Sequence, residues 1–367
     1  MSSSSSTFSS ETVVEIAERP TQEVPEREFS KLERARIGRV PWAAIGTVLV
    51  IGCVEFVLRS NREWFADSAA WQWQSKSELI ESGKLHGDIA VIGTSVLFHS
   101  VDPAELNARS RTERRVINLA LNGLQLNGQY HLLSRYLDGG NDPEFVLLEL
   151  SRVDVERERW ISGPFWRDWA TWPEFLSSRS YSFEPSLAIP FAANRALTSF
   201  SYRRALDNWV FASVRSGGLD TSYRDRNRQI TSDMDRHLGF SPGSFDRSMT
   251  EADIPPGESR PWRQTRAGAI WLEHILDLCD RHGIEVWILQ PPVPPFVAEE
   301  RRRDGFRAGF VALVADLRQR YPRLGLEVLE PTGYELADFA DHRHFSPQGS
   351  RKLCRDLVPW VDSLTVH

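Results

Sequence analysis

A serine, a histidine and an aspartate stand at positions from which they could together perform acyl chemistry. Ser95 follows a short apolar run that ends at Gly93, and Asp341 precedes His344 by three residues in a polar stretch near the C-terminus. A serine hydroxyl becomes a nucleophile when an adjacent histidine takes its proton, and a carboxylate orients and stabilises that histidine. We therefore predict Ser95 as the nucleophile, His344 as the general base and acid, and Asp341 as the orienting carboxylate.

The same chemistry needs hydrogen-bond donors for the oxyanion that forms when a serine attacks an ester. Gly123 follows a second apolar run, and it lacks a side chain that would hinder close approach to its backbone. We predict the backbone amides of Ser95 and Gly123 as donors, with the side chain of Asn122 as a further candidate. Thr94 and Arg152, which also follow apolar runs, are predicted to contact the substrate, and Arg152 is a second candidate for the additional donor.

Each of these signals is weak by itself. A serine after a strand is more often only the N-cap of the next helix, and Asp-x-x-His occurs frequently by chance. The combination is more specific if the elements that carry these residues bring them to one place.

Five apolar runs are predicted as strands of that common scaffold. Near-continuous apolar runs are typical of parallel strands that are covered on both faces. The runs are residues 88–93, 115–120, 144–150, 284–290 and 325–330. Helical patterns between them predict βαβ units and a doubly wound α/β sheet. Because ligands bind beyond the carboxyl ends of such strands, the candidate residues would meet at one edge of the sheet.

One stretch interrupts the alternation of strands and helices. From about residue 151 to residue 262 the sequence has no evident buried strand and is rich in tryptophan and arginine. We interpret it as an insertion or cap that is mainly helical. Trp160 and Trp166 are predicted to contact a sugar substrate by stacking, and the alternative is that these aromatic residues form the core of the cap.

The N-terminal part predicts a membrane anchor. Residues 1–39 are predicted to be a disordered tail, and residues 40–58 are apolar over close to the length that a membrane helix needs. Basic residues are more numerous before this segment than after it, which favours a cytoplasmic N-terminus and places residues 59–367 outside the cytoplasm. The alternative is a buried core helix, supported by Glu55, because a carboxylate inside a bilayer is costly.

The overall composition limits the function classes. The chain has 44 basic and 50 acidic residues, a net charge of −6, so it has no general basic surface for nucleic acid. The three cysteines do not form a disulfide framework. They are interpreted as free thiols, although a bridge between Cys279 and Cys354 remains open.

Three blocks of sequence resemble the SGNH (GDSL-like) hydrolase superfamily. They are V-I-G-T-S-V-L-F-H-S-V-D-P at residues 91–103, I-N-L-A-L-N-G at residues 117–123 and D-H-R-H-F-S-P-Q-G at residues 341–349. The resemblance spans roughly residues 85–150 and 265–360. It implies a flavodoxin-like three-layer α/β/α fold with strand order 2-1-3-4-5, and serine acyl chemistry that needs no metal or organic cofactor.

The resemblance has two departures. Thr94 replaces the aspartate of the family's G-D-S pattern, and the third block, G-x-N-D, is missing. The chain has E-L-S-R-V-D at residues 149–154 instead, so the family's asparagine oxyanion donor has no clear match. Membrane-anchored members that O-acetylate alginate or help to D-alanylate teichoic acids are similar in layout to this chain.

These observations predict an extracytoplasmic serine esterase or O-acyltransferase that acts on a cell-envelope or exported carbohydrate. A membrane protein that supplies the acyl group is a candidate partner. The rival hypothesis is a catalytically degenerate SGNH scaffold that binds polysaccharide or a membrane partner. A third hypothesis is a metal-dependent hydrolase that uses Asp341, His342 and His344, although three neighbouring residues are poor geometry for one metal.

Overall fold

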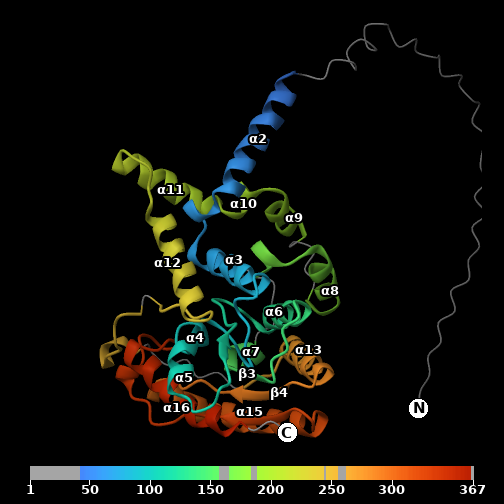
Figure 1. Cartoon of the computed structure of the whole chain (residues 1–367), viewed down its shortest axis with the longest axis vertical. Coiled ribbons are helices and arrows are strands. Elements are labelled where there is room, and N and C mark those ends of the chain that lie inside the picture. The colour runs from blue at the N-terminus through green and yellow to red at the C-terminus, as the bar shows by residue number, and fades with distance from the viewer. Residues whose placement is uncertain (1–41, 157–164, 183–187, 244, 255–261, 365–367) are drawn as a thin grey trace, which may run out of the picture. The chain divides into compact units, whose positions relative to one another are not determined.

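The computed structural model describes residues 42–156, 165–182, 188–243, 245–254 and 262–364 (Figure 1). The predicted tail at residues 1–39 therefore lies outside the described residues. The chain divides into two compact units, Met1–Cys53 and Val54–His367. All five strands of the sheet belong to the second unit.

A five-stranded sheet, all parallel, forms the centre of the second unit. Its strands are β1 (Ile89–Ile92), β2 (Val116–Asn118), β3 (Phe145–Glu149), β4 (Glu285–Leu289) and β5 (Gly325–Leu329). Their order across the sheet is β2-β1-β3-β4-β5, and every neighbouring pair is parallel. The prediction of an α/β chain with five parallel strands in the order 2-1-3-4-5 is confirmed. Every residue of β1, β2 and β3 is buried, as expected for strands that are covered on both faces.

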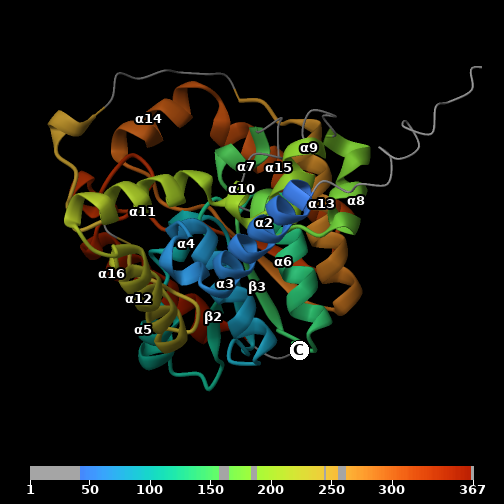
Figure 2. The same ribbon diagram turned by 90° about the horizontal axis from the view of Figure 1, so that it is seen from above.

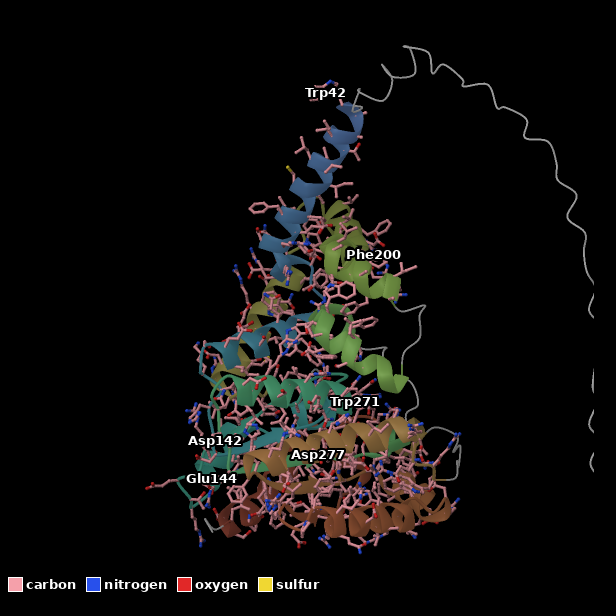
Figure 3. The ribbon with its side chains drawn as sticks, turned by 90° about the vertical axis from the view of Figure 1, so that its right-hand side faces the viewer. Trp42, Asp142, Glu144, Phe200, Trp271 and Asp277 are labelled. Carbon is pink, nitrogen blue, oxygen red and sulfur yellow. The ribbon has the colours of Figure 1, made fainter. Side chains whose placement is uncertain are left out.

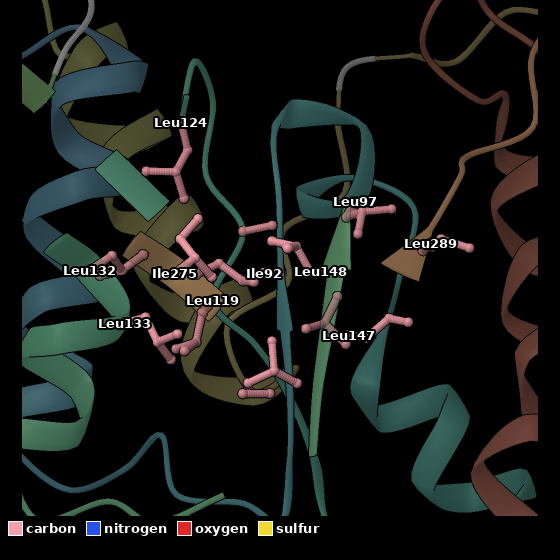
Figure 4. Close-up of a cluster of buried hydrophobic side chains, with 14 of the residues drawn as sticks. Ile92, Leu97, Leu119, Leu124, Leu132, Leu133, Leu147, Leu148, Ile275 and Leu289 are labelled. Carbon is pink, nitrogen blue, oxygen red and sulfur yellow. The ribbon is translucent and has the colours of Figure 1, made fainter. Parts of the chain in front are cut away.

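Helices connect the strands and cover them. They are α3 (Ser68–Glu81), α4 (Ser95–Phe98), α5 (Pro103–Arg109), α6 (Leu126–Asp138), α13 (Arg266–His282), α14 (Pro295–Arg303), α15 (Phe306–Arg320) and α16 (Pro347–Ser363), with the short 3-10 helices η1 (Arg62–Trp64) and η5 (Leu336–Asp338). Helix α6 packs against α13, and α5 packs against α16. Figure 4 shows Leu132 and Leu133 of α6 and Ile275 of α13 beside the strand residues Ile92 and Leu148, and all five side chains are buried. The labelled Trp271 and Asp277 mark α13 in Figure 3.

The insertion is helical throughout its described part, as predicted. It contains α7 (Arg152–Glu156), the π-helix η2 (Phe165–Trp169), α8 (Trp172–Ser182), α9 (Ala188–Ala196), α10 (Thr198–Ser201), α11 (Arg203–Ser216), α12 (Ser222–Arg236) and the 3-10 helix η4 (Glu251–Asp253). Helix α12 packs against α3, and α10 contacts both α9 and α11. Seen from above in Figure 2, α9, α10 and α11 lie on the side of the second unit that faces the viewer.

Helix α2 (Trp42–Ser60) is the candidate membrane helix. Among the described helices it is the one long and apolar enough to cross a membrane, two residues further along the chain than predicted. Glu55 is its only buried residue, which is not the pattern of a core helix. The Glu55 carboxylate accepts hydrogen bonds from the backbone amides of Thr198 (2.6 Å) and Ser199 (3.1 Å) at the start of α10. Protein donors therefore satisfy this carboxylate.

The three cysteines are free thiols, and the open question of a bridge is settled against it. Cys279 and Cys354 are both buried and unpaired, and Cys53 is exposed.

Candidate active site

The turn after β1 positions Ser95. Ser95 is the first residue of α4, and the hydroxyl of Thr94 caps this helix by accepting from the backbone amide of Val96 (3.3 Å). Gly93 fits here because a Cβ atom would lie 2.4 Å from the carboxylate of Glu149. The short helix therefore presents Ser95 at the carboxyl end of the sheet.

A tight turn before α16 positions Asp341 and His344. The Asp341 carboxylate accepts hydrogen bonds from the backbone amides of Arg343 (2.7 Å) and His344 (2.9 Å). A bridge between Phe339 and Phe345 closes the turn, and Ser346 then caps α16. The spacing of three residues thus lets one carboxylate hold both the backbone and the side chain of the histidine.

The structure brings the three predicted catalytic residues together. The Ser95 hydroxyl lies 2.9 Å from Nε2 of His344, and Nδ1 of His344 lies 2.8 Å from Oδ2 of Asp341. Burial raises the pKa of Asp341, but hydrogen bonds from the His344 side chain and from the two backbone amides outweigh it and hold this pKa well below its ordinary value. An ionised Asp341 accepts the proton of Nδ1, which leaves Nε2 free to take the proton of Ser95.

A cavity of about 580 Å³ opens beside Ser95. Thr94, Gly123 and Arg152 line it together with Ser95. Much of the remaining wall is apolar and comes from Leu124, Val153, Pro291, Pro292, Val293, Phe296 and Val297. Gly123 has a φ of 69°, a backbone conformation that favours glycine. Four of the predicted site residues thus share one cavity.

Asn122 lies elsewhere, because its side chain contacts His99. Nδ1 of His99 donates to the carbonyl of Ser241 (2.7 Å), and Nε2 lies 2.9 Å from the Asn122 side-chain amide. Burial lowers the pKa of His99 to about 4, so the ring is neutral and Nε2 accepts a hydrogen bond from Asn122. Asn122 is not among the residues that line the cavity, so the structure does not offer its amide to an oxyanion there.

Arg152 lines the cavity, but its charge is already compensated. Its guanidinium pairs with Glu156 (2.9 Å) and with Asp304. Because both partners hold the side chain, Arg152 ties α7 to the end of α14 rather than standing free for substrate.

The predicted sugar-stacking tryptophans are not in the cavity wall. Trp166 is 4% exposed and packs against His131, Phe165 and Phe175, so it belongs to the aromatic core of the insertion, as in the alternative interpretation. Trp160 lies outside the described residues.

Glu149 is a site residue that the sequence analysis missed. It ends β3 at 0% exposure, and its carboxyl group accepts from the backbone amide (2.6 Å) and the hydroxyl (2.9 Å) of Thr94. Burial, and then the charge of Asp154, raise its pKa to about 8. An acidic residue in the apolar run F-V-L-L-E-L was an available signal, because burying a carboxylate is costly. This contact also explains Thr94, since a hydroxyl can donate to Glu149 where an aspartate would repel it.

Phe245 is a second neighbour that the sequence did not reveal. Its ring stacks on the imidazole of His344, with 4.4 Å between centroids and 14° between planes. The edge of the same ring contacts His99 at 5.4 Å. The insertion therefore supplies one wall beside the candidate general base.

Replacing Phe245 with alanine should slow acylation of Ser95 by about tenfold. The aromatic face restrains the imidazole, and its contact with a cationic imidazolium is worth about 1 kcal/mol. The measurement is the second-order rate of reaction with a fluorophosphonate. Phe245→Tyr keeps the ring and should react like the wild type; an equal loss in both variants would count against the stacking argument.

No metal cluster accompanies these residues in the described part of the chain. Across those ranges no group of three histidine, cysteine or acidic side chains is arranged to hold an ion. Asp341 and His344 are bonded to each other, and His342 is exposed.

Comparison with known proteins leaves the family open. No protein-family model matches the chain, and no curated protein matches it.

Proposed function

We propose that this protein is a serine esterase or O-acyltransferase with Ser95 as its nucleophile. The observation that carries the proposal is the hydrogen-bonded series from Ser95 through His344 to Asp341, with distances of 2.9 and 2.8 Å. A general base must reach its nucleophile at hydrogen-bond distance, and these residues do so across 249 positions of sequence.

The proposed reaction has two steps. Nε2 of His344 takes the proton of Ser95 as its oxygen attacks the acyl carbonyl, and the backbone amides of Ser95 and Gly123 stabilise the oxyanion. His344 then protonates the departing alcohol, which leaves an acyl ester on Ser95. Water or a sugar hydroxyl, deprotonated by His344, attacks this ester and releases Ser95. Asp341 stays ionised throughout and stabilises the imidazolium.

The finer parts of the proposal rest on the sequence blocks and on α2. The resemblance to SGNH hydrolases supports membership of that superfamily with its three-layer flavodoxin-like fold, and the strand order agrees with it. Helix α2 supports an anchored protein, and the distribution of basic residues supports a cytoplasmic N-terminus. A carbohydrate acceptor and a membrane protein that supplies the acyl group complete the proposal for a transferase.

Intact mass of the full-length protein after exposure to a fluorophosphonate tests the proposal. One adduct is expected on the wild type and none on Ser95→Ala. Ser151→Ala is the matched control, because Ser151 lines the same cavity without a histidine at its hydroxyl, and it should still gain one adduct.

An absence of adduct on folded wild-type protein would instead support the second candidate, a scaffold that binds polysaccharide without catalysis. One observation favours that candidate. Asn122 is bonded to His99, and Arg152 is paired with Glu156 and Asp304, so neither predicted substitute supplies the family's third oxyanion donor.

A further inference from the structure

Three arginines gather where α2 ends. A pocket of about 160 Å³ is lined by Arg59, Arg62 and Arg195 together with Asn194, Thr198, Ser201 and Tyr202. None of these residues is acidic. The nearest carboxylate in the described structure, Glu55, is held by the amides of Thr198 and Ser199. The pocket therefore offers concentrated positive charge to an anion.

The guanidinium groups are partly fixed and partly unused. Arg59 donates to the hydroxyl of Thr198 (3.2 Å) and to the carbonyl of Ala196 (2.9 Å), which orients it without neutralising it. Nε of Arg62 is buried and has no hydrogen-bond partner in the described chain. Neither arginine forms an ion pair with a described carboxylate. A planar guanidinium in this state suits a phosphate, which accepts two parallel hydrogen bonds from it.

The surface near the pocket is unusually apolar. Ile189 of α9 is 78% exposed, and Phe211 and Val214 of α11 are 75% and 76% exposed. Leu219, just after α11, is 68% exposed. Helices α9 and α11 both contact α10, whose first residue lines the pocket (Figure 1). Exposed apolar side chains beside arginines are typical of protein surfaces that lie in the head-group region of a bilayer.

The position along α2 agrees with that location. The apolar sequence of α2 ends at Leu58, and Arg59 and Arg62 follow at once. Basic residues at the end of a membrane helix lie at the level of the lipid phosphates.

We infer that the pocket formed by Arg59, Arg62 and Arg195 binds the phosphate of a membrane phospholipid, with the exposed apolar side chains of α9 and α11 against the same leaflet. The inference rests on α2 spanning a membrane and is independent of the chemistry at Ser95. A bound lipid would fix the second unit against the bilayer through a contact additional to α2.

Native mass spectrometry of the full-length protein in a neutral maltoside detergent tests the inference. Phosphatidylglycerol, a phosphate-free galactosyl diacylglycerol and inorganic phosphate are titrated separately. The wild type is expected to bind phosphatidylglycerol more tightly than either of the other two. Arg62→Gln should weaken that binding by roughly tenfold or more, the loss expected for a charge-assisted hydrogen bond.

Arg204→Gln is the matched control. Arg204 is exposed on α11 and does not line the pocket, so the same change of charge should leave the affinity for phosphatidylglycerol unchanged. Arg62→Lys keeps the charge but loses the planar fork, and it should retain part of the affinity. Equal affinity in Arg62→Gln and wild type, or binding of inorganic phosphate or galactolipid as tight as that of phosphatidylglycerol, would overturn the inference.

The anchor is measured separately by extracting membranes with alkaline carbonate. Retention of the wild type and of Arg62→Gln is expected, since α2 is intact in both. Release of the wild type would refute the membrane span, and the lipid site with it.

Discussion

Replacing His344 with alanine is expected to lower the rate of acylation of Ser95 by about 10⁴-fold. The Ser95 hydroxyl donates to Nε2 of His344 at 2.9 Å, and within the described residues the structure shows no other base at hydrogen-bond distance from it. Without that base the hydroxyl stays protonated and is a poor nucleophile. The measurement is kcat/KM for hydrolysis of an activated acetyl ester by the full-length protein in detergent.

His342→Ala provides the control for this prediction. His342 lies two residues away in the same loop, is exposed and lines the cavity, but it has no contact with Ser95. Its removal should change kcat/KM by less than about threefold, because surface substitutions remove little transition-state stabilisation. If His344→Ala hydrolysed the ester as fast as His342→Ala, the proposed role of His344 as general base would be wrong.

The pairing of Ser95 with His344 was predictable because each lies beyond the carboxyl end of a parallel strand. Strand β1 ends at Ile92 and β5 ends at Leu329, and the loops that leave parallel strands start from the same edge of the sheet. The sequence therefore predicted a meeting of residues 249 positions apart from a rule about sheets. It required only the recognition of apolar runs.

The limits of the strands were less predictable than their existence. The apolar run at residues 115–120 predicted a strand of six residues, but β2 ends at Asn118. Leu119, Ala120 and Leu121 beyond it are fully buried, yet they lie in the loop toward Gly123. Hydrophobic patterns report burial, and a buried loop residue is as apolar as a buried strand residue.

The residues that surround the candidate base were not predictable in the same way. Phe245 and His99 meet beside His344 because the insertion folds back over the start of α4. No periodicity encodes such a contact, since it depends on tertiary packing between segments that are far apart in the chain. The same reason explains why Trp166 proved to be a core residue and not a substrate contact.

Replacing Glu149 with glutamine is expected to remove most of a pH-dependent loss of stability. The folded-state pKa of Glu149 is raised from its ordinary value of 4.5 to about 8, by burial first and by Asp154 second, against the hydrogen bonds from Thr94 and Leu97. Between these two pH values the folded protein holds a proton that the unfolded chain has released, so the free energy of unfolding falls as pH rises. The loss amounts to several kcal/mol, because a tenfold difference in proton affinity corresponds to about 1.4 kcal/mol.

The measurement is the thermal unfolding midpoint of the full-length protein in detergent from pH 4.5 to pH 9. A glutamine has no proton to release in this range, so Glu149→Gln should unfold at a nearly constant temperature while the wild type becomes less stable. Glu144→Gln makes the same change on the exposed residue just before β3 and should follow the wild type. A wild-type curve as flat as that of Glu149→Gln would mean that the donors of Thr94 keep Glu149 ionised in the folded state. The turn that carries Ser95 would then rest on a buried carboxylate, and Thr94→Val, which removes the hydroxyl donor at 2.9 Å, should destabilise the protein by about 1.5 to 3 kcal/mol.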